Sequence, residues 1–284
     1  MSSMRRTLLG LWASCHPGPT VVVTALAAAL SLAAGLDLGR AALLTVAVFA
    51  GQLSIGISND ALDSARDRSV GRADKPISMG DVDLRTAWTA AVGALVLALL
   101  LSAPLGIWVL LGHAVMLASA WSYNLGLKAS AFSLVPFLIT FGLFPSLPTL
   151  TSPEPQAAAW WAWAAGAALG AAIHLTNVLP DLDDDARTGI RGLPHRLGGR
   201  PSAILAASGV LLGALAVSLG PGGGAVGQLN GVAWVFFGLV VALVIVTVVL
   251  TAMGHSGRTL FRLVMLAALL LAVQLVASGQ GLVG

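Results

Sequence analysis

The chain has 284 residues, of which 57% are hydrophobic and 10% are charged, and its mean hydropathy is +0.90. These values exclude an ordinary soluble domain and are typical of a protein that crosses a membrane several times. The single cysteine, Cys15, excludes an internal disulfide and a cysteine-based metal site. The net charge of +3 is small and the basic residues neighbour acids and apolar runs, so we expect no nucleic-acid partner.

Nine apolar runs follow one another along the chain, each about as long as a helix that crosses a bilayer. They lie at approximately residues 18–36, 41–58, 86–103, 106–123, 131–148, 157–179, 202–219, 229–252 and 260–279. The sequence therefore predicts an all-α polytopic membrane protein, a bundle of nine transmembrane helices that forms one domain over residues 1–284.

The basic residues predict how this bundle is oriented. If the N-terminus lies in the cytoplasm, 14 of the 15 lysines and arginines fall on the cytoplasmic side, and only Arg40 falls outside. Cytoplasmic loops carry such an excess of basic residues. We therefore expect a multi-pass protein of the cell membrane with its C-terminus outside and its chemistry at the cytoplasmic side.

Ten of the twelve acidic residues lie in two short clusters, each directly after an apolar run. We expect each cluster to continue a helix at its cytoplasmic end. In the first cluster Asn59, Asp63 and Asp67 are four residues apart, and positions four and eight apart share one face of a helix. Asp60, three residues before Asp63, is expected close to that face.

The second cluster repeats the pattern 118 residues later. Asn177, Asp181 and Asp185 have the same spacing of four residues. Glycine, arginine and proline residues follow both clusters in partly matching order. We infer two halves of related design, around residues 41–85 and 157–200, each of which supplies acids and bases.

Carboxylates are costly near a bilayer, so two such rows need a partner that offsets their mutual repulsion. Mg²⁺ fits, because it takes one or two carboxylates together with phosphate oxygens. Two facing rows could hold such ions around a diphosphate, while arginines and lysines neutralise the remaining phosphate charge. This arrangement makes diphosphate a good leaving group and favours ionisation of a C–O bond.

Two other interpretations are weaker. Solvated helix ends explain a few charges at loop edges, but not asparagine and aspartate recurring on one helix face in two loops. A cation transporter would place its acids near the middle of the bilayer at broken helices. Here the acids lie at helix ends beside arginines, which favours a phosphate ligand.

The motifs resemble those of the UbiA-type membrane prenyltransferases, which carry NDxxDxxxD and DxxxD motifs on nine transmembrane helices. The matching residues are Asn59, Asp60, Asp63 and Asp67 for the first motif and Asp181 and Asp185 for the second. The segments 71–76, 121–128 and 187–198 are also similar to stretches that follow these motifs and the fourth helix in that family.

The resemblance implies Mg²⁺-dependent transfer of a prenyl group from an isoprenoid diphosphate to a small aromatic or quinone-precursor acceptor, in a central cavity open toward the cytoplasmic side. The implied metal ligands are Asn59, Asp60, Asp63, Asp67, Asp181 and Asp185. The implied substrate-binding residues are Asn59, Arg72, Lys75, Lys128, Asn177 and Arg191. The implied catalytic residues are Asp63, Asp67, Asp181, Asp185, Lys128 and Tyr123.

Several points stay open at the level of sequence. A terpene cyclase of the same family would use the same metal ligands without an acceptor, and a phosphoribosyl-transferring branch also retains them. His16-Pro17 stands where many relatives have Arg-Pro, which weakens the case for a benzoate-like acceptor. For His174 we favour a hydrogen-bonded helix histidine over an acid–base role in acceptor deprotonation.

Overall fold

The computed structural model describes residues 3–71, 74–179, 191–225, 231–255, 258–278 and 281–283. All the regular secondary structure in these residues is helical, which confirms the all-α prediction. The long helices are α2 (Pro17–Ala33), α3 (Leu38–Ser69), α5 (Leu84–Ser102), α6 (Ile107–Asn124), α9 (Trp160–Asn177), α12 (Gly199–Leu219), α13 (Gly231–Ala252) and α14 (Arg258–Ala277). Shorter ones are α1 (Ser3–Ser14), α4 (Pro76–Met79), α7 (Val135–Leu143), α8 (Ser146–Thr151), α11 (Leu193–Leu197) and the 3-10 turns η1 (Ala103–Leu105) and η2 (Leu127–Ala129).

Helices occupy each of the nine apolar runs, but the fifth run is divided between α7 and α8. The division falls at Pro145, whose ring nitrogen has no hydrogen to donate to a continuing helix. Among the described residues, five helices are long and apolar enough to cross a membrane: α3, α5 with η1, α12, α13 and α14. Helices α1 and α2, bent by 68°, add a sixth if they count as one span. The chain is thus a multi-pass membrane protein, and nine spans remain a prediction.

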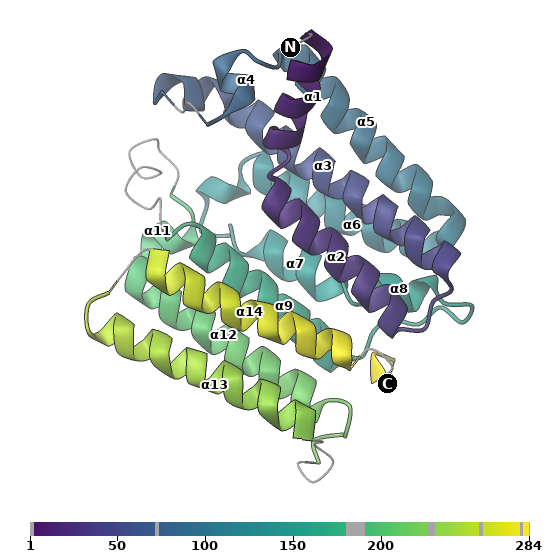
Figure 1. Ribbon diagram of the computed structural model, residues 1–284, viewed down its shortest axis with the longest axis vertical. Coiled ribbons are helices and arrows are strands. Elements are labelled where there is room, and N and C mark those ends of the chain that lie inside the picture. Colours follow the sequence, from purple (N-terminus) through teal and green to yellow (C-terminus); the bar gives the residue numbers. More distant parts are fainter. Residues whose placement is uncertain are drawn as a thin grey trace.

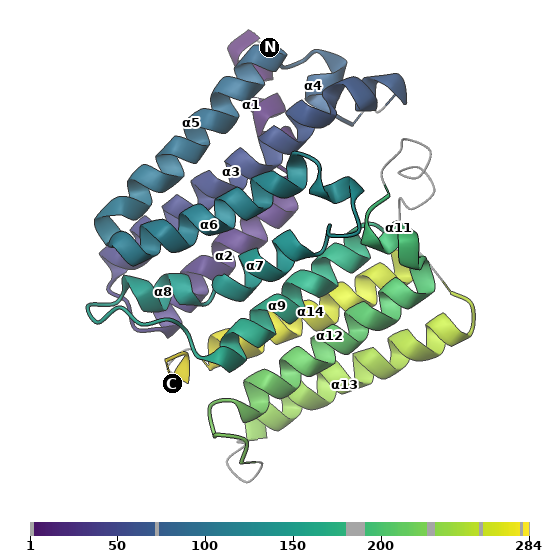
Figure 2. The ribbon, with the colours of Figure 1, turned by 180° about the vertical axis from the view of Figure 1, so that it is seen from behind.

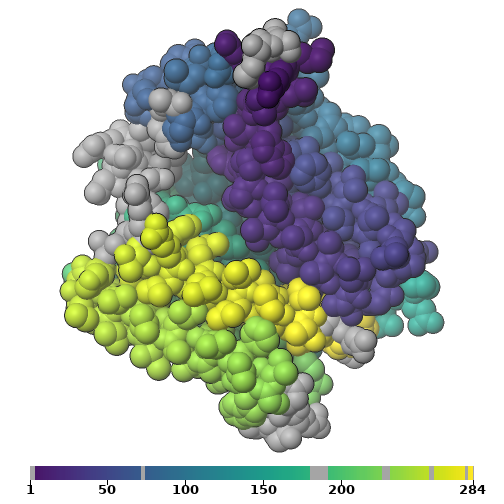
Figure 3. Space-filling model, viewed as in Figure 1, coloured from purple at the N-terminus to yellow at the C-terminus, as the bar shows by residue number. Residues whose placement is uncertain are grey.

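The bundle is organised as two groups of helices (Figures 1 and 2). In the first, α3 packs between α2 and α5, and α6 packs on α3 and α5. In the second, α12 packs against α9, α13 and α14. The groups meet where α7 lies on α9 and where α14 lies on α2. In the space-filling view, the surface is hollowed between α14, which is yellow, and the blue residues of the first group (Figure 3). Teal residues are visible at the bottom of this hollow.

Helix α3 carries the first acidic cluster, as the sequence predicts. Its 32 residues correspond to about 48 Å, whereas the hydrocarbon core of a bilayer is about 30 Å thick. The acidic third of the helix, from Asn59 onward, therefore lies beyond the apolar span. At the second cluster, α9 ends at Asn177 and a turn follows at Val178 and Leu179, so α9 does not extend past the start of the cluster as α3 does.

Close packing of α7 on α9 depends on a glycine. A Cβ added at Gly170 would lie 2.5 Å from the carbonyl oxygen of Phe137. That oxygen belongs to the backbone of α7 and cannot move like a side chain. The absence of a side chain at Gly170 thus lets the two helices approach, which brings Phe137 beside His174 one turn further along α9.

We expect Gly170→Ala to lower the free energy of unfolding by about 1–3 kcal/mol, because the methyl group forces α7 and α9 apart. Gly93→Ala in α5 is the matched control, since nothing lies within 4 Å of its added Cβ and alanine favours a helix by about 1 kcal/mol. Thermal unfolding of both variants in detergent measures the difference. Equal midpoints for the two variants would contradict this packing argument.

Candidate functional site

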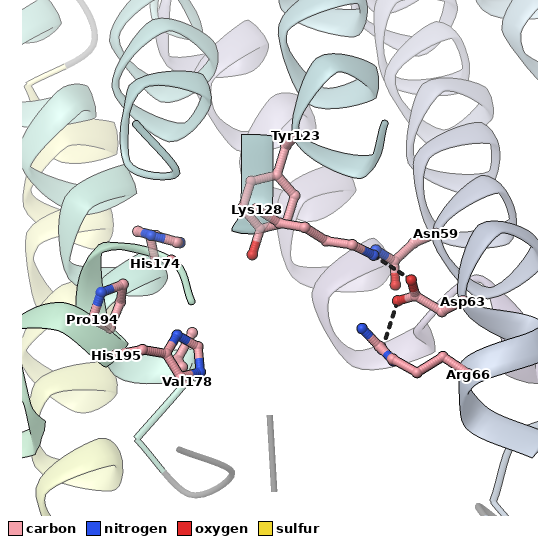
Figure 4. Close-up of a pocket in the computed structure, with 10 residues that line it drawn as sticks. Asn59, Asp63, Arg66, Tyr123, Lys128, His174, Val178, Pro194 and His195 are labelled. Atoms are coloured by element: carbon pink, nitrogen blue, oxygen red, sulfur yellow. Dashed lines mark hydrogen bonds and ion pairs between the residues drawn. The ribbon is translucent and has the colours of Figure 1, made fainter. Parts of the chain in front are cut away.

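A pocket lies between the acidic part of α3 and the ends of α9 and α11 (Figure 4). Its lining comes from four parts of the chain that are distant in sequence. The lining residues are Asn59, Asp63 and Arg66 of α3, Tyr123 of α6, Lys128 of η2, His174 and Val178 at the end of α9, and Gly192, Pro194 and His195 around α11.

Asp63 is the centre of the charged wall of the pocket. The ammonium Nζ of Lys128 lies 2.5 Å from Asp63 Oδ1, and Nη2 of Arg66 lies 2.9 Å from Asp63 Oδ2. Arg66 also contacts Oδ1 of Asp67 at 3.3 Å. The side chains of Asp63 and Lys128 are 13% and 12% exposed, so each needs the opposite charge of its partner. Two cations and two carboxylates therefore meet at one place; Asp63, Asp67 and Arg66 belong to α3, and Lys128 comes from η2.

Asn59 lies one helical turn before Asp63, and a hydrogen bond to a residue of α6 holds its side chain in place. Its Nδ2 donates to Oδ1 of Asn124 at 3.0 Å. One turn earlier, Nε1 of Trp121 donates to Oγ of Ser54 at 3.1 Å. These bonds set the position of α6 along α3, and α6 in turn carries Tyr123 into the pocket.

The opposite wall of the pocket is aromatic. The buried ring of His174 lies 4.7 Å from the ring of Phe137, and the Tyr123 ring stands perpendicular to both, at 87°. Nε2 of His174 is 3.0 Å from Oγ of Ser133, which also accepts the Leu193 backbone N–H at 2.8 Å. His174 is therefore the hydrogen-bonded helix histidine that we favoured from the sequence.

Asp60 and Lys75 belong to a second cluster outside the lining of the pocket. Oδ1 of Asp60 lies 2.6 Å from Nζ of Lys75 and 3.0 Å from Nε2 of His16. Asp60 is 2% exposed, and His16 has a left-handed backbone (φ 55°) at the bend between α1 and α2. The carboxylate thus joins the bend to α3 and to the start of α4.

The remaining predicted site residues are distributed as follows. Asp67 is 3% exposed and pairs with Arg66 behind the lining. Asn177 and Arg191 are exposed and do not line the pocket. The predicted residues Arg72, Asp181 and Asp185 lie outside the described residues.

Three residues of the site were not singled out from the sequence. Arg66 lies three residues after Asp63, a spacing that allows an ion pair on a helix. Asn124 directly follows Tyr123, and nothing in the sequence indicates that its side chain is hydrogen-bonded to α3. His195 has no sequence signal of its own, and only the position of α11 places it in the pocket.

The residues present fit a magnesium ion. Mg²⁺ prefers carboxylate and amide oxygens, which Asp63 and Asn59 supply within one turn of α3. No group of three or more histidine, cysteine, aspartate or glutamate side chains converges in the part of the chain that the structure describes. Because Mg²⁺ with a bound diphosphate needs only one or two carboxylates, this donor set is still sufficient.

A protein-family model described as the UbiA prenyltransferase family matches residues 20–272. The chain belongs to this family. An apo UbiA homologue from Aeropyrum pernix K1 has a TM-score of 0.72 at 19% identity, with coverage of 90% of this chain and 96% of that one. A UbiA homologue from Archaeoglobus fulgidus bound to GPP and Mg²⁺ has a TM-score of 0.69 at 13% identity, with coverage of 95% and 99%.

A digeranylgeranylglyceryl phosphate synthase has a TM-score of 0.70 at 15% identity, with coverage of 96% of this chain and 99% of that one. No curated protein sequence matches the chain. At these identities the likeness to solved structures shows the UbiA fold. Together with the family match, it confirms the resemblance that the two acidic motifs carry.

We expect Lys75→Met to lower the free energy of unfolding by about 3–5 kcal/mol, because it leaves the buried carboxylate of Asp60 without its ammonium partner. Adding Asp60→Asn should recover part of this loss, because the second change removes the uncompensated charge. Thermal unfolding of the single and double variants measures both effects. A Lys75→Met protein as stable as the wild type would show that the pair does not stabilise the packing of the start of α4 on α3.

Proposed function

We propose that this UbiA-family protein transfers a prenyl group from an isoprenoid diphosphate to a small acceptor, most simply an aromatic or quinone-precursor ring. The observation that carries the proposal is the meeting of Asn59, Asp63, Arg66 and Lys128 in one pocket. Carboxylate and amide oxygens suit Mg²⁺, and the arginine and lysine suit phosphate oxygens. The homologue that binds GPP together with Mg²⁺ supports the same combination of ligands.

The second acidic motif is proposed to complete the metal site. The chain leaves the pocket wall at Val178 and returns to it at Gly192. Asp181 and Asp185 lie between these two points in the sequence, and Arg72 and Arg191 are proposed to contact the diphosphate from the flanking loops. The two motifs would then face each other from the related halves around residues 41–85 and 157–200.

The roles of the chain's own groups follow from their positions. Bound Mg²⁺ would neutralise the diphosphate so that it leaves as a stable anion. Lys128 and Arg66, which now neutralise Asp63, have N–H groups that can turn to the phosphate oxygens. Tyr123, on the opposite wall, would lie beside the allylic carbon, where the face of an aromatic ring stabilises positive charge.

We further propose that the site faces the cytoplasm, with the N-terminus on the same side and the C-terminus outside. The acidic end of α3 carries Arg66 and Arg68, and Lys128 lies beside it. Such a gathering of basic residues at one end of the bundle is the pattern of cytoplasmic loops.

We expect Asp63→Asn to slow Mg²⁺-dependent release of diphosphate from geranyl diphosphate by about 10²- to 10³-fold, because the transition state loses a charged metal ligand. Asp181→Asn should have an effect of the same order. Asp83→Asn is the control: Asp83 is an exposed carboxylate outside the pocket that caps α5, and asparagine caps a helix equally well. Diphosphate release assayed with EDTA and with added Mg²⁺ tests the proposal, which fails if both pocket variants keep the wild-type rate.

A product analysis separates transfer from cyclisation. With geranyl diphosphate and an aromatic acceptor, we expect a prenylated acceptor and faster diphosphate release than without the acceptor. Mass spectrometry of products made with and without quinone precursors provides the measurement. A cyclic hydrocarbon formed from the diphosphate alone would instead identify a terpene cyclase that uses the same residues.

A further inference from the structure

Asn124, at the C-terminal end of α6, connects α6 to the first acidic motif. It is 4% exposed and does not line the pocket. Its Nδ2 donates to the backbone carbonyl of Ile55 at 2.9 Å and to Oγ of Ser58 at 3.0 Å. Its Oδ1 accepts from Nδ2 of Asn59 at 3.0 Å. Both protons of its amide group and its oxygen therefore have partners on α3.

These partners fix the orientation of two side-chain amides. The carbonyl oxygen of Ile55 can only accept, so Asn124 must turn its NH₂ group toward it. Oδ1 of Asn124 then faces Asn59, and because this oxygen also can only accept, Asn59 must turn its own NH₂ group toward Asn124. The amide is planar, so Oδ1 of Asn59 is left on the other side, free of Asn124.

The orientation of Asn59 matters for the chemistry of the pocket that it lines. An amide oxygen is a ligand for Mg²⁺, whereas an amide NH₂ group presents two protons and repels a cation. A flipped Asn59 would therefore replace an attractive contact with a repulsive one. An oxygen ligand of this kind adds no negative charge beside Asp63 and Asp67.

We propose that Asn124 is a positioning residue that holds the side-chain oxygen of Asn59 toward the metal ion and diphosphate. The inference rests on the proposed function and adds to it a residue outside the two acidic motifs. Partners that orient the ligands of a metal ion commonly change its affinity by about 10- to 100-fold when they are removed. The same size of effect is expected here.

Asn124 could instead serve only as an interhelical hydrogen bond that stabilises the packing of α6 on α3. The chain offers a matched control for that role. The bond from Trp121 to Ser54 joins the same two helices one turn away and has no link to Asn59. Ser54→Ala should therefore lower the thermal midpoint without changing the affinity for metal.

The test measures Mn²⁺ binding to the full chain in detergent by electron paramagnetic resonance, with inorganic diphosphate present. Asn124→Leu should weaken Mn²⁺ binding by about 10- to 100-fold, and Asn59→Ala should weaken it similarly. The double variant should bind no more weakly than Asn59→Ala alone, because Asn124 acts through Asn59. Asn124→Ala replaces Asn124→Leu if the leucine variant does not fold.

Each outcome is decisive. Wild-type affinity in the Asn124 variant, with weakened binding in Asn59→Ala, overturns the inference and leaves the proposed function intact. Losses that add in the double variant overturn it too, because Asn124 would then act independently of Asn59. Absence of Mn²⁺ binding in the wild type contradicts the metal site of the proposed function, and the inference fails with it.

Discussion

The site depends on how one half-buried carboxylate is neutralised. Asp63 lies between Arg66, on its own helix, and Lys128, which follows 65 residues later in the turn after α6. A buried acid without an opposite charge is strongly destabilising, so this ion pair holds the loop after α6 against α3. The same loop continues to Ser133, which bonds to His174 on the opposite wall. Neutralising Asp63 thereby assembles both sides of the pocket.

Two aspartates three residues apart have different surroundings because of helix geometry. Three residues turn a helix by about 300°, so side chains at these positions diverge by about 60°. Asp63 points to the pocket, whereas Asp60 points to Lys75 and His16 at the bend between α1 and α2. The first acidic motif thus joins the bend between α1 and α2 to α3 and also supplies the charged wall of the pocket. The repeated spacing of acidic residues therefore does not imply that every carboxylate in the motif has the same role.

Helix periodicity was enough to predict α3, its extension through the acidic cluster and the shared face of Asn59 and Asp63. The division of α7 from α8 could have been read from Pro145, because proline interrupts a helix for a local reason. The hydrogen-bond partners of Asp60, Asn59 and His174 could not have been predicted from the sequence. Each partner comes from another helix or loop, and its position depends on how the helices pack. His195 illustrates the limit: the segment 187–198 resembles a family stretch, but nothing in the sequence indicates that His195 itself faces the pocket, and only the position of α11 shows it.

The two walls of the pocket differ in the charge that they can stabilise. The wall at α3 presents the carboxylate of Asp63, the amide of Asn59 and the cations of Arg66 and Lys128, which suits a diphosphate with its counter-ions. The opposite wall presents the rings of Tyr123 and His174, which pack on Phe137, and the face of an aromatic ring suits a cationic carbon. The proposed reaction separates an anionic leaving group from an allylic cation and would use both environments in one pocket. The packing of α6 on α3, and of α7 on α9, is what places them on opposite sides of one cavity.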